Sequence, residues 1–207
     1  MKIGIIGAGQ IGSTLARRFT ELGHEVFIAN SRGPASLAGF AKETGATAVT
    51  VSEAARAGKV VVVTIPEGRI RELSMDLFHG VPADVVVIDT GNYYPRERDG
   101  RIDEIEGGMA ESRWVQTQLG RPVVKAFNNI YAKQLLESGR PADAPARIAL
   151  PVAGDDAKAK EFGAAIDRPT RVRRSGCWRF GRFLATAARY ACLWKGLRQL
   201  RCASCIG

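Results

Sequence analysis

MKIGIIGAGQIG, residues 1–12, is an apolar run that ends in a glycine-rich turn. Residues 2–6 predict a short parallel strand buried on both faces, and the apolar spacing of Ile11, Leu15 and Phe19 predicts that a helix follows. A Gly-x-Gly-x-x-Gly turn between a strand and a helix is the context in which this motif binds a dinucleotide. The flanking elements make the prediction far more specific than the glycines alone would.

Each residue of the turn has an expected role. Gly7 permits the tight bend, Gly9 lets the backbone approach a pyrophosphate, and Gly12 lets the helix pack closely on the strand. The first helical turn, with Gln10 and Ile11, offers free N–H groups and a partial positive charge to phosphates. The alternative interpretation is a glycine-rich turn without a ligand.

The end of the second predicted strand, residues 25–29, distinguishes between the two nicotinamide cofactors. Proteins that bind NAD place Asp or Glu here to bond the ribose 2′-hydroxyl, whereas this chain has Asn30-Ser31-Arg32. A carboxylate would repel a 2′-phosphate, while Ser31 can donate a hydrogen bond and Arg32 can offer a charged fork. We therefore predict NADP as the cofactor, with an ordinary polar loop as the alternative.

Strand and helix patterns alternate over residues 1–167 and predict an α/β protein. The expected architecture is a doubly wound, mostly parallel sheet, the NAD(P)-binding Rossmann fold. Further strands are expected over residues 47–51, 59–65, 84–89, 123–127 and 147–153. Helices are expected over residues 34–44, 53–57, 69–78, 110–119 and 131–138, and from Asp155-Asp156 onward. Residues 95–108 are expected to form a polar surface loop.

The formal charge of +9 originates in the last 40 residues of the chain. Residues 168–207 hold nine Arg, one Lys, no Asp or Glu and all four Cys, which leaves 20 basic and 21 acidic residues in 1–167. Charge confined to one segment does not indicate a nucleic-acid partner for the remainder. Residues 1–167 therefore have the composition of an ordinary globular domain.

Three interpretations of residues 168–207 are open. The segment could be a basic amphipathic helix at a membrane or a nucleic-acid-binding arm. We favour a shift of reading frame near residues 167–171, because suitable synonymous codons let the neighbouring frame encode an acidic segment. The expected domains are thus 1–167, an NADP-binding Rossmann domain with a short C-terminal extension, and 168–207, an aberrant tail. The C-terminal part of the fold would then be disrupted, with the edge of its last strand uncovered.

The sequence also indicates the cellular compartment and the classes of binding partner. Met1-Lys2 leads directly into a strand instead of a secretory apolar core, and no window of 18 apolar residues exists. A cytoplasmic protein without membrane or nucleic-acid partners is therefore expected. The cysteines lack zinc-ligand spacing, so no metal site is predicted.

With these motifs in place, the sequence resembles the coenzyme F420 (deazaflavin)-dependent NADP oxidoreductase family. The matching segments, which span about residues 1–165, are residues 1–12, Asn30-Ser31-Arg32, Thr64-Ile65-Pro66, 124–128 and 151–155. The resemblance implies that Ser31 and Arg32 hold the 2′-phosphate, that the turn at 64–66 lies beside the nicotinamide, and that residues 125–129 form a wall of the cleft. The predicted cofactor-binding residues are Gly7, Gly9, Gln10, Ile11, Gly12, Asn30, Ser31, Arg32, Thr64, Ile65, Pro66, Asn92, Ala126 and Asn128.

The predicted reaction is hydride transfer between NADPH and a second cofactor or small acceptor, such as a deazaflavin or a flavin. No Ser/His or His/Cys arrangement stands out, and we assign no catalytic acid or base, since in such reactions the cofactor carries the chemistry. Residues 90–94 depart from the archaeal deazaflavin enzymes, so the resemblance does not extend to deazaflavin specificity. Asn92 and Tyr93 are candidates for contact with the second substrate.

The alternative function is that of a non-catalytic dinucleotide-binding or redox-sensing module. An imine reductase would need a long helical C-terminal region for which this chain has no room. Dimers are common among the relatives, so a homodimer is a further expectation.

Overall fold

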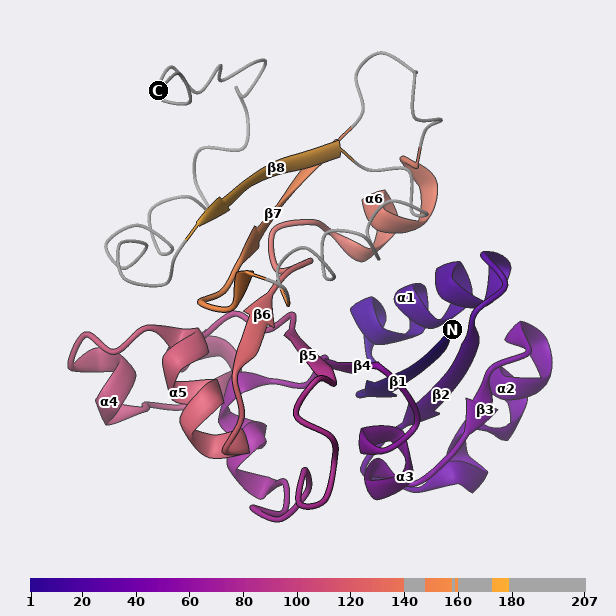
Figure 1. Cartoon of the computed structure of the whole chain (residues 1–207), viewed down its shortest axis with the longest axis horizontal. Coiled ribbons are helices and arrows are strands. Elements are labelled where there is room, and N and C mark those ends of the chain that lie inside the picture. The colour runs from indigo at the N-terminus through magenta and orange to yellow at the C-terminus, as the bar shows by residue number, and fades with distance from the viewer. Residues whose placement is uncertain (140–147, 158, 160–172, 179–207) are drawn as a thin grey trace.

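The computed structural model describes residues 1–139, 148–157, 159 and 173–178, and an eight-stranded sheet forms its centre (Figure 1). The strand order is β3-β2-β1-β4-β5-β6-β7-β8. In chain order the strands are β1 (Lys2–Ile6), β2 (Glu25–Ala29), β3 (Thr47–Ala48), β4 (Val60–Val63), β5 (Val86–Asp89), β6 (Val123–Lys125), β7 (Ala149–Ala153) and β8 (Arg173–Trp178). Strands β1 to β6 pair in parallel, β7 is antiparallel to β6, and β8 is parallel to β7. The predicted doubly wound, mostly parallel sheet is confirmed.

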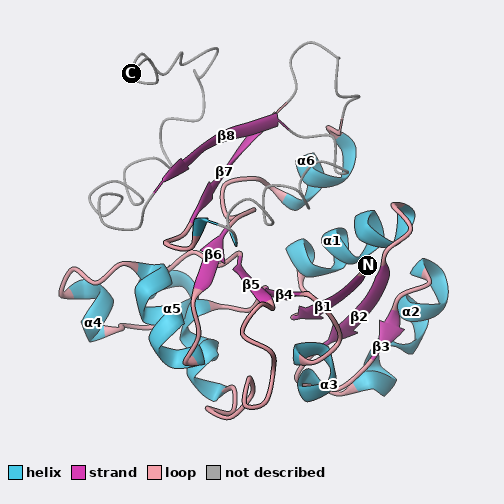
Figure 2. Cartoon of the chain, in the orientation of Figure 1, coloured by secondary structure: helices cyan, strands magenta, loops and turns pink. Residues whose placement is uncertain are grey.

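Helices cover both faces of the sheet, and each face has its own apolar cluster (Figure 2). On one face, α1 (Gln10–Glu21), α2 (Ala38–Thr44) and α6 (Ala132–Glu137) pack over Ile3 and Ile5 of β1. On the other face lie α3 (Val51–Ala55), the 3-10 turn η2 (Glu67–Glu72) and α5 (Glu111–Leu119). Alternate β1 side chains therefore serve opposite layers, as a strand buried on both faces requires.

Gly4 determines how closely α3 approaches the sheet. A Cβ at this position would lie 1.9 Å from the carbonyl oxygen of Ala54 in α3. A capping box fixes the start of α3, in which the Thr50 hydroxyl accepts from the Glu53 N–H and the Glu53 carboxylate accepts from the Thr50 N–H. The missing side chain and the cap together seat this short helix against β1.

Some local predictions differ from the structure. The helix expected over 69–78 is wrong: residues 67–72 form η2, and turns follow. Asp99 accepts a hydrogen bond from the Gly68 N–H at 3.2 Å, so a contact distant in sequence shapes this first turn. The polar loop expected over 95–108 contains a π-helical turn, η3 (Pro95–Asp99), and α4 (Asp103–Glu106), and it buries Ile102.

The last predicted helix begins as expected, since Asp156 accepts a hydrogen bond from the N–H of Ala159. In the predicted aberrant tail, residues 173–178 form β8, which pairs with β7 at the edge expected to be uncovered. The other residues of 168–207 lie outside the described part of the chain.

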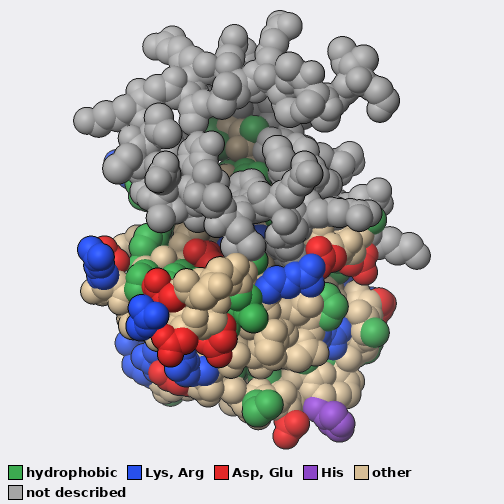
Figure 3. Space-filling model, turned by 90° about the vertical axis from the view of Figure 1, so that its left-hand side faces the viewer, with side chains coloured by type: hydrophobic (Ala, Val, Ile, Leu, Met, Phe, Trp, Pro, Cys, Tyr) green, Lys and Arg blue, Asp and Glu red, His purple; other side chains and the backbone are tan. Residues whose placement is uncertain are grey.

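The described surface carries charges of both signs side by side on the face shown in Figure 3. This mixture agrees with the near-neutral balance of residues 1–167. In the described part of the chain, no helix combines the length and apolar character needed to cross a membrane.

Candidate cofactor site

The carboxyl ends of the parallel strands meet along one edge of the sheet. The residues that follow β1, β4, β5 and β6 each donate a backbone hydrogen bond to the last residue of a neighbouring strand. These bonds run from Gly7 N to Ala29 O, Thr64 N to Ile6 O, Thr90 N to Val63 O and Ala126 N to Asp89 O, with lengths of 2.8–3.1 Å. The segments predicted to bind the cofactor therefore form a continuous row where ligands bind in this architecture.

The glycine turn lies at the middle of this row. Gly7 has a φ of 115°, and a Cβ there would lie 2.3 Å from the Thr64 carbonyl oxygen. A Cβ at Gly12 would lie 2.0 Å from the Gly7 carbonyl oxygen. Gly9 differs, because its Cβ would meet nothing within 4 Å. Gly7 and Gly12 are thus required by backbone packing, whereas Gly9 keeps open the space before the N-terminus of α1, where no side chain caps the helix.

The loop after β2 presents two polar side chains to solvent. The Asn30 side chain accepts from the Arg32 N–H at 2.9 Å and contacts the Ser36 hydroxyl, which in turn donates to the Gly33 carbonyl at 2.7 Å. Asn30 is thus committed to shaping the loop. Ser31 and Arg32 are exposed, and within the described ranges neither side chain has a hydrogen-bond or ion-pair partner. The loop therefore holds a free cation beside the glycine turn.

The segments after β4, β5 and β6 close the other side of the row. Ile65 lies against the glycine turn, since a Cβ on Gly7 would be 2.8 Å from Ile65 Cγ2. Asn92 Nδ2 donates to the Asn128 carbonyl at 2.7 Å, and Asn128 Nδ2 donates to Asn92 Oδ1 at 3.2 Å. The two amides therefore join the ends of β5 and β6.

Phe127, beside Asn128, is the one non-glycine residue with positive φ in the described chain, at 60°. A bulky side chain in this region is strained, and such strain is concentrated at functional sites. The side chain is buried in the same apolar cluster as α1, which holds the backbone in this conformation. The bend lies between Ala126 and Asn128, two of the residues predicted to bind cofactor.

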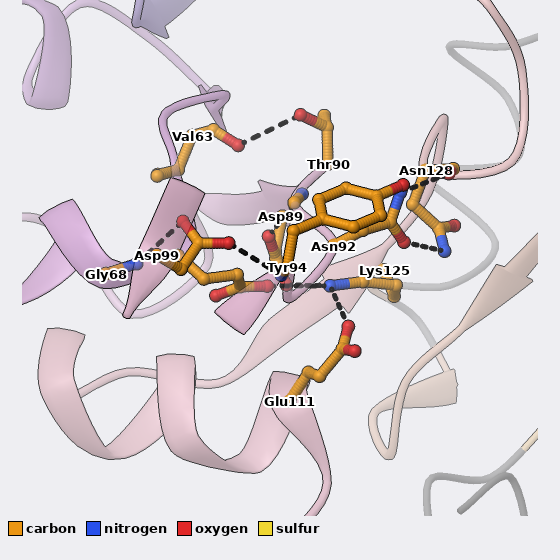
Figure 4. A network of polar contacts seen from close by, with 12 residues as sticks. Val63, Gly68, Asp89, Thr90, Asn92, Tyr94, Asp99, Glu111, Lys125 and Asn128 are labelled. Carbon is orange, nitrogen blue, oxygen red and sulfur yellow. Dashed lines mark hydrogen bonds and ion pairs between the residues drawn. The ribbon is translucent and has the colours of Figure 1, made fainter. Parts of the chain in front are cut away.

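A buried charge cluster, not predicted from the sequence, lies where β5 and β6 end and where η2 and α5 begin (Figure 4). Lys125, 8% exposed, ends β6, and its ammonium lies 2.8 Å from Asp89 Oδ2, 3.2 Å from Glu67 Oε1 and 3.6 Å from Glu111 Oε2. We call these four residues the Lys125 cluster. A signal for it was present, because Asp89 and Lys125 each end a valine-rich strand, and charged groups in such a position need partners.

Burial and charge shift the pKa values within the Lys125 cluster. Burial, followed by the charge of Asp89, raises the pKa of Glu67 to about 8, although Lys125 acts in the opposite sense. Burial by itself would lower the pKa of Lys125, but Asp89, Glu67 and Glu111 raise it above its ordinary value. The three carboxylates therefore favour the charged ammonium of Lys125, while burial favours the protonated form of Glu67. Glu67 Oε2 is buried without a hydrogen-bond partner in the described structure.

Tyr93, a candidate for contact with a second substrate, makes internal contacts. Its hydroxyl accepts from the Ile102 N–H at 2.8 Å and lies 3.1 Å from a Glu106 carboxylate oxygen. These contacts tie the 95–108 segment to the end of β5. A role for Tyr93 in substrate binding stays a prediction.

The strand order and the glycine turn define an NAD(P)-binding Rossmann fold. A family described as NADP oxidoreductase, coenzyme F420-dependent, matches residues 2–93. The F420-dependent NADP reductase of Methanothermobacter thermautotrophicus is 31% identical over 164 residues, which cover 72% of this chain and 70% of that protein. The chain belongs to the coenzyme F420-dependent NADP oxidoreductase family, as the resemblance predicted, and its class is that of NADP-dependent oxidoreductases.

Two solved structures extend the likeness. A hypothetical protein from Sinorhizobium meliloti is 30% identical with a TM-score of 0.71, over 86% of this chain and 85% of that one. A candidate F420-dependent NADP reductase from Arthrobacter sp. is 21% identical with a TM-score of 0.69, over the same 86% and 85%. The second comparison, at its lower identity, supports the fold alone.

Proposed function

We propose that this chain binds NADPH along the row of strand ends and transfers hydride between NADPH and a second cofactor or small acceptor. The observation that carries the proposal is the free, exposed Arg32 on a braced loop beside an uncapped helix N-terminus. A 2′-phosphate needs a cation and a pyrophosphate needs free N–H donors. Arg32 provides the cation and the start of α1 provides the free N–H donors, at adjoining strand ends.

The proposed binding mode assigns each part of the cofactor to a segment. The pyrophosphate meets Gly9, Gln10 and Ile11 at the start of α1, and the 2′-phosphate meets Ser31 and Arg32. The nicotinamide lies toward Thr64-Ile65-Pro66, with Asn92, Ala126 and Asn128 at the far wall. The nicotinamide of the bound cofactor supplies the hydride-transfer chemistry, and the protein orients the rings and excludes water.

A deazaflavin is the first acceptor to test, because a relative of this chain is named an F420-dependent NADP reductase. We also propose that residues 1–167 form the NADP-binding domain, that the protein acts in the cytoplasm, and that it is a homodimer. Light scattering is the test of the homodimer.

The frame-shift hypothesis for residues 168–207 is tested by resequencing the gene. An intact frame with no insertion or deletion relative to close relatives would contradict it.

The first test compares NADPH and NADH in fluorescence titrations of the wild type and Arg32→Ala. Loss of a charge-assisted contact of ~1.5–3 kcal/mol should weaken NADPH binding by about 10- to 100-fold and leave NADH binding nearly unchanged. Arg56→Ala is the matched control, because Arg56 lies at the opposite edge of the sheet, near the starts of β1, β4 and β5. Equal affinity of the wild type for both cofactors would overturn the assignment of the Asn30-Ser31-Arg32 loop.

The second test measures NADPH oxidation with deazaflavin, flavin, quinone, ferric and imine acceptors. Turnover with one of them identifies the acceptor class. Tight NADPH binding without turnover on any acceptor would instead support the non-catalytic dinucleotide-binding module.

A further inference from the structure

The Lys125 cluster gathers one carboxylate from each of three segments around a single ammonium. Asp89 ends β5, Glu67 begins η2 directly after Pro66, and Glu111 begins α5. The Lys125 ammonium lies within 3.2 Å of both Asp89 and Glu67. One cation thus links the backbone that follows β4, β5 and β6.

The cluster also fixes the turn that carries Asn92. The second carboxylate oxygen of Asp89 accepts from the Gly91 N–H at 2.8 Å. Gly91 itself lies so close to the cluster that a Cβ there would be 2.7 Å from Glu67 Oε1 and 3.2 Å from Asp89 Oδ1. The position of Asn92, and through it that of Asn128, therefore depends on the geometry of the cluster.

We propose that Lys125 is a positioning residue for the nicotinamide half of the cofactor site. Its ammonium acts through Asp89 on the Gly91–Asn92 turn and through Glu67 on the loop at 64–66. The inference rests on the proposed function, since it assigns these segments to the nicotinamide. The 2′-phosphate half lies at the other end of the row, on the loop after β2, and has no contact with the Lys125 cluster among the described residues.

If Lys125 positions the cofactor site, the affinity for NADPH should depend on the charge state of Glu67. A merely structural role would not produce this pH dependence. The groups facing Glu67 are Asp89 from β5, Lys125 from β6 and Glu111 from α5, while Asp99 of η3 bonds the neighbouring Gly68 N–H. With Glu67 protonated, two carboxylates face one ammonium. Ionisation adds a third, buried carboxylate, and we expect its repulsion from Asp89 to loosen the turn beneath Asn92.

The decisive experiment compares two ligands on Lys125→Met. NADPH needs both halves of the site, whereas adenosine 2′,5′-bisphosphate, which lacks the nicotinamide, needs only the glycine turn and the loop with Arg32. We expect NADPH binding to weaken by about tenfold or more while adenosine 2′,5′-bisphosphate binding stays within about twofold. Lys59→Met is the matched control. Lys59 lies directly before β4, is exposed and pairs with Asp84, so its replacement should leave both affinities unchanged. Equal losses for both ligands, or no loss for either, would overturn the proposal.

If Lys125→Met fails to fold, Glu67→Gln decides the question. Glutamine resembles the protonated acid and cannot ionise, so NADPH binding to this variant should not change between about pH 7 and 9.5. Binding to the wild type should weaken several-fold as the pH rises through the Glu67 pKa of about 8. Superimposable pH profiles for the two proteins would contradict the proposal. Failure of the folded wild type to bind NADPH at neutral pH would instead defeat the proposed function.

Discussion

The three glycines of the turn show how much a single side chain matters at this site. Gly7 and Gly12 lie against backbone atoms, and each would bring a Cβ within 2.3 Å of a carbonyl oxygen. Gly9 lies in open space with an ordinary φ of −75°. Glycines of one motif therefore serve two purposes, because two of them close the fold and the third leaves room for a ligand.

This difference predicts opposite results for two alanine substitutions. Gly12→Ala should lower the free energy of unfolding by ~1–3 kcal/mol, because the helix must move off the strand to admit a methyl group. Gly9→Ala should change it by less than about 0.5 kcal/mol, but should weaken NADPH binding by about tenfold or more because the methyl group occupies the pyrophosphate position. Urea unfolding and NADPH titration of both variants provide the check. A destabilised Gly9→Ala protein with normal binding would reverse the two roles.

At the scale of elements, short helices are held by contacts that few residues specify. α3 has only five residues, Val51–Ala55, yet it covers β1 where Gly4 lets it approach. Such a helix is not stable by propensity alone and depends on its cap and its packing. The capping box of Thr50 and Glu53 is therefore one of the main local determinants of this layer.

Removal of the cap should be measurable. Thr50→Ala should cost about 1 kcal/mol in the free energy of unfolding, because the Glu53 N–H at the start of α3 loses its acceptor. Thr117→Ala is the control, since the exposed Thr117 hydroxyl only donates back to the Arg113 carbonyl within α5. A loss for Thr50→Ala no larger than that of the control would show that packing by itself fixes α3.

The sequence predicted the elements that follow from local pattern and missed those set by distant contacts. The strand–turn–helix at residues 2–21 and α5 were predicted because their apolar spacing and glycines are local. The helix expected at 69–78 was wrong, because Glu67 and Gly68 are held by Lys125 and Asp99, which lie far along the chain. The pairing in the Lys125 cluster was missed for the same reason, since spacing in sequence does not reveal which strand ends become neighbours.

For the whole molecule, the Lys125 cluster couples stability to pH. The folded-state pKa of Glu67, about 8, lies above its ordinary value of 4.5. Between these values the folded chain binds more protons at Glu67 than the unfolded chain, so the contribution of this group to stability falls as the pH rises. It is fully present below the ordinary value and is lost as the pH passes through about 8.

Comparison with Glu67→Gln isolates this effect from all other titrating groups. The stability of the variant relative to the wild type should increase from about pH 5 to pH 8, with a slope of at most ~1.4 kcal/mol per pH unit. Urea unfolding at several pH values measures this difference. A difference that does not vary with pH would mean that Glu67 ionises in the folded protein as it does in an exposed position.

The central place of β1 has a consequence for the order in which the molecule assembles. β1 pairs with β2, which follows closely in sequence, and with β4, whose partner residues 60–63 come more than 50 positions later. The glycine turn is enclosed only when Thr64 bonds to Ile6. Such non-local parallel pairing requires closure of a long loop and is intrinsically slow. A nascent chain that has not yet added β4 thus lacks the enclosed turn, and the dinucleotide that we propose as the ligand would bind and stabilise only chains that have assembled the centre of the sheet.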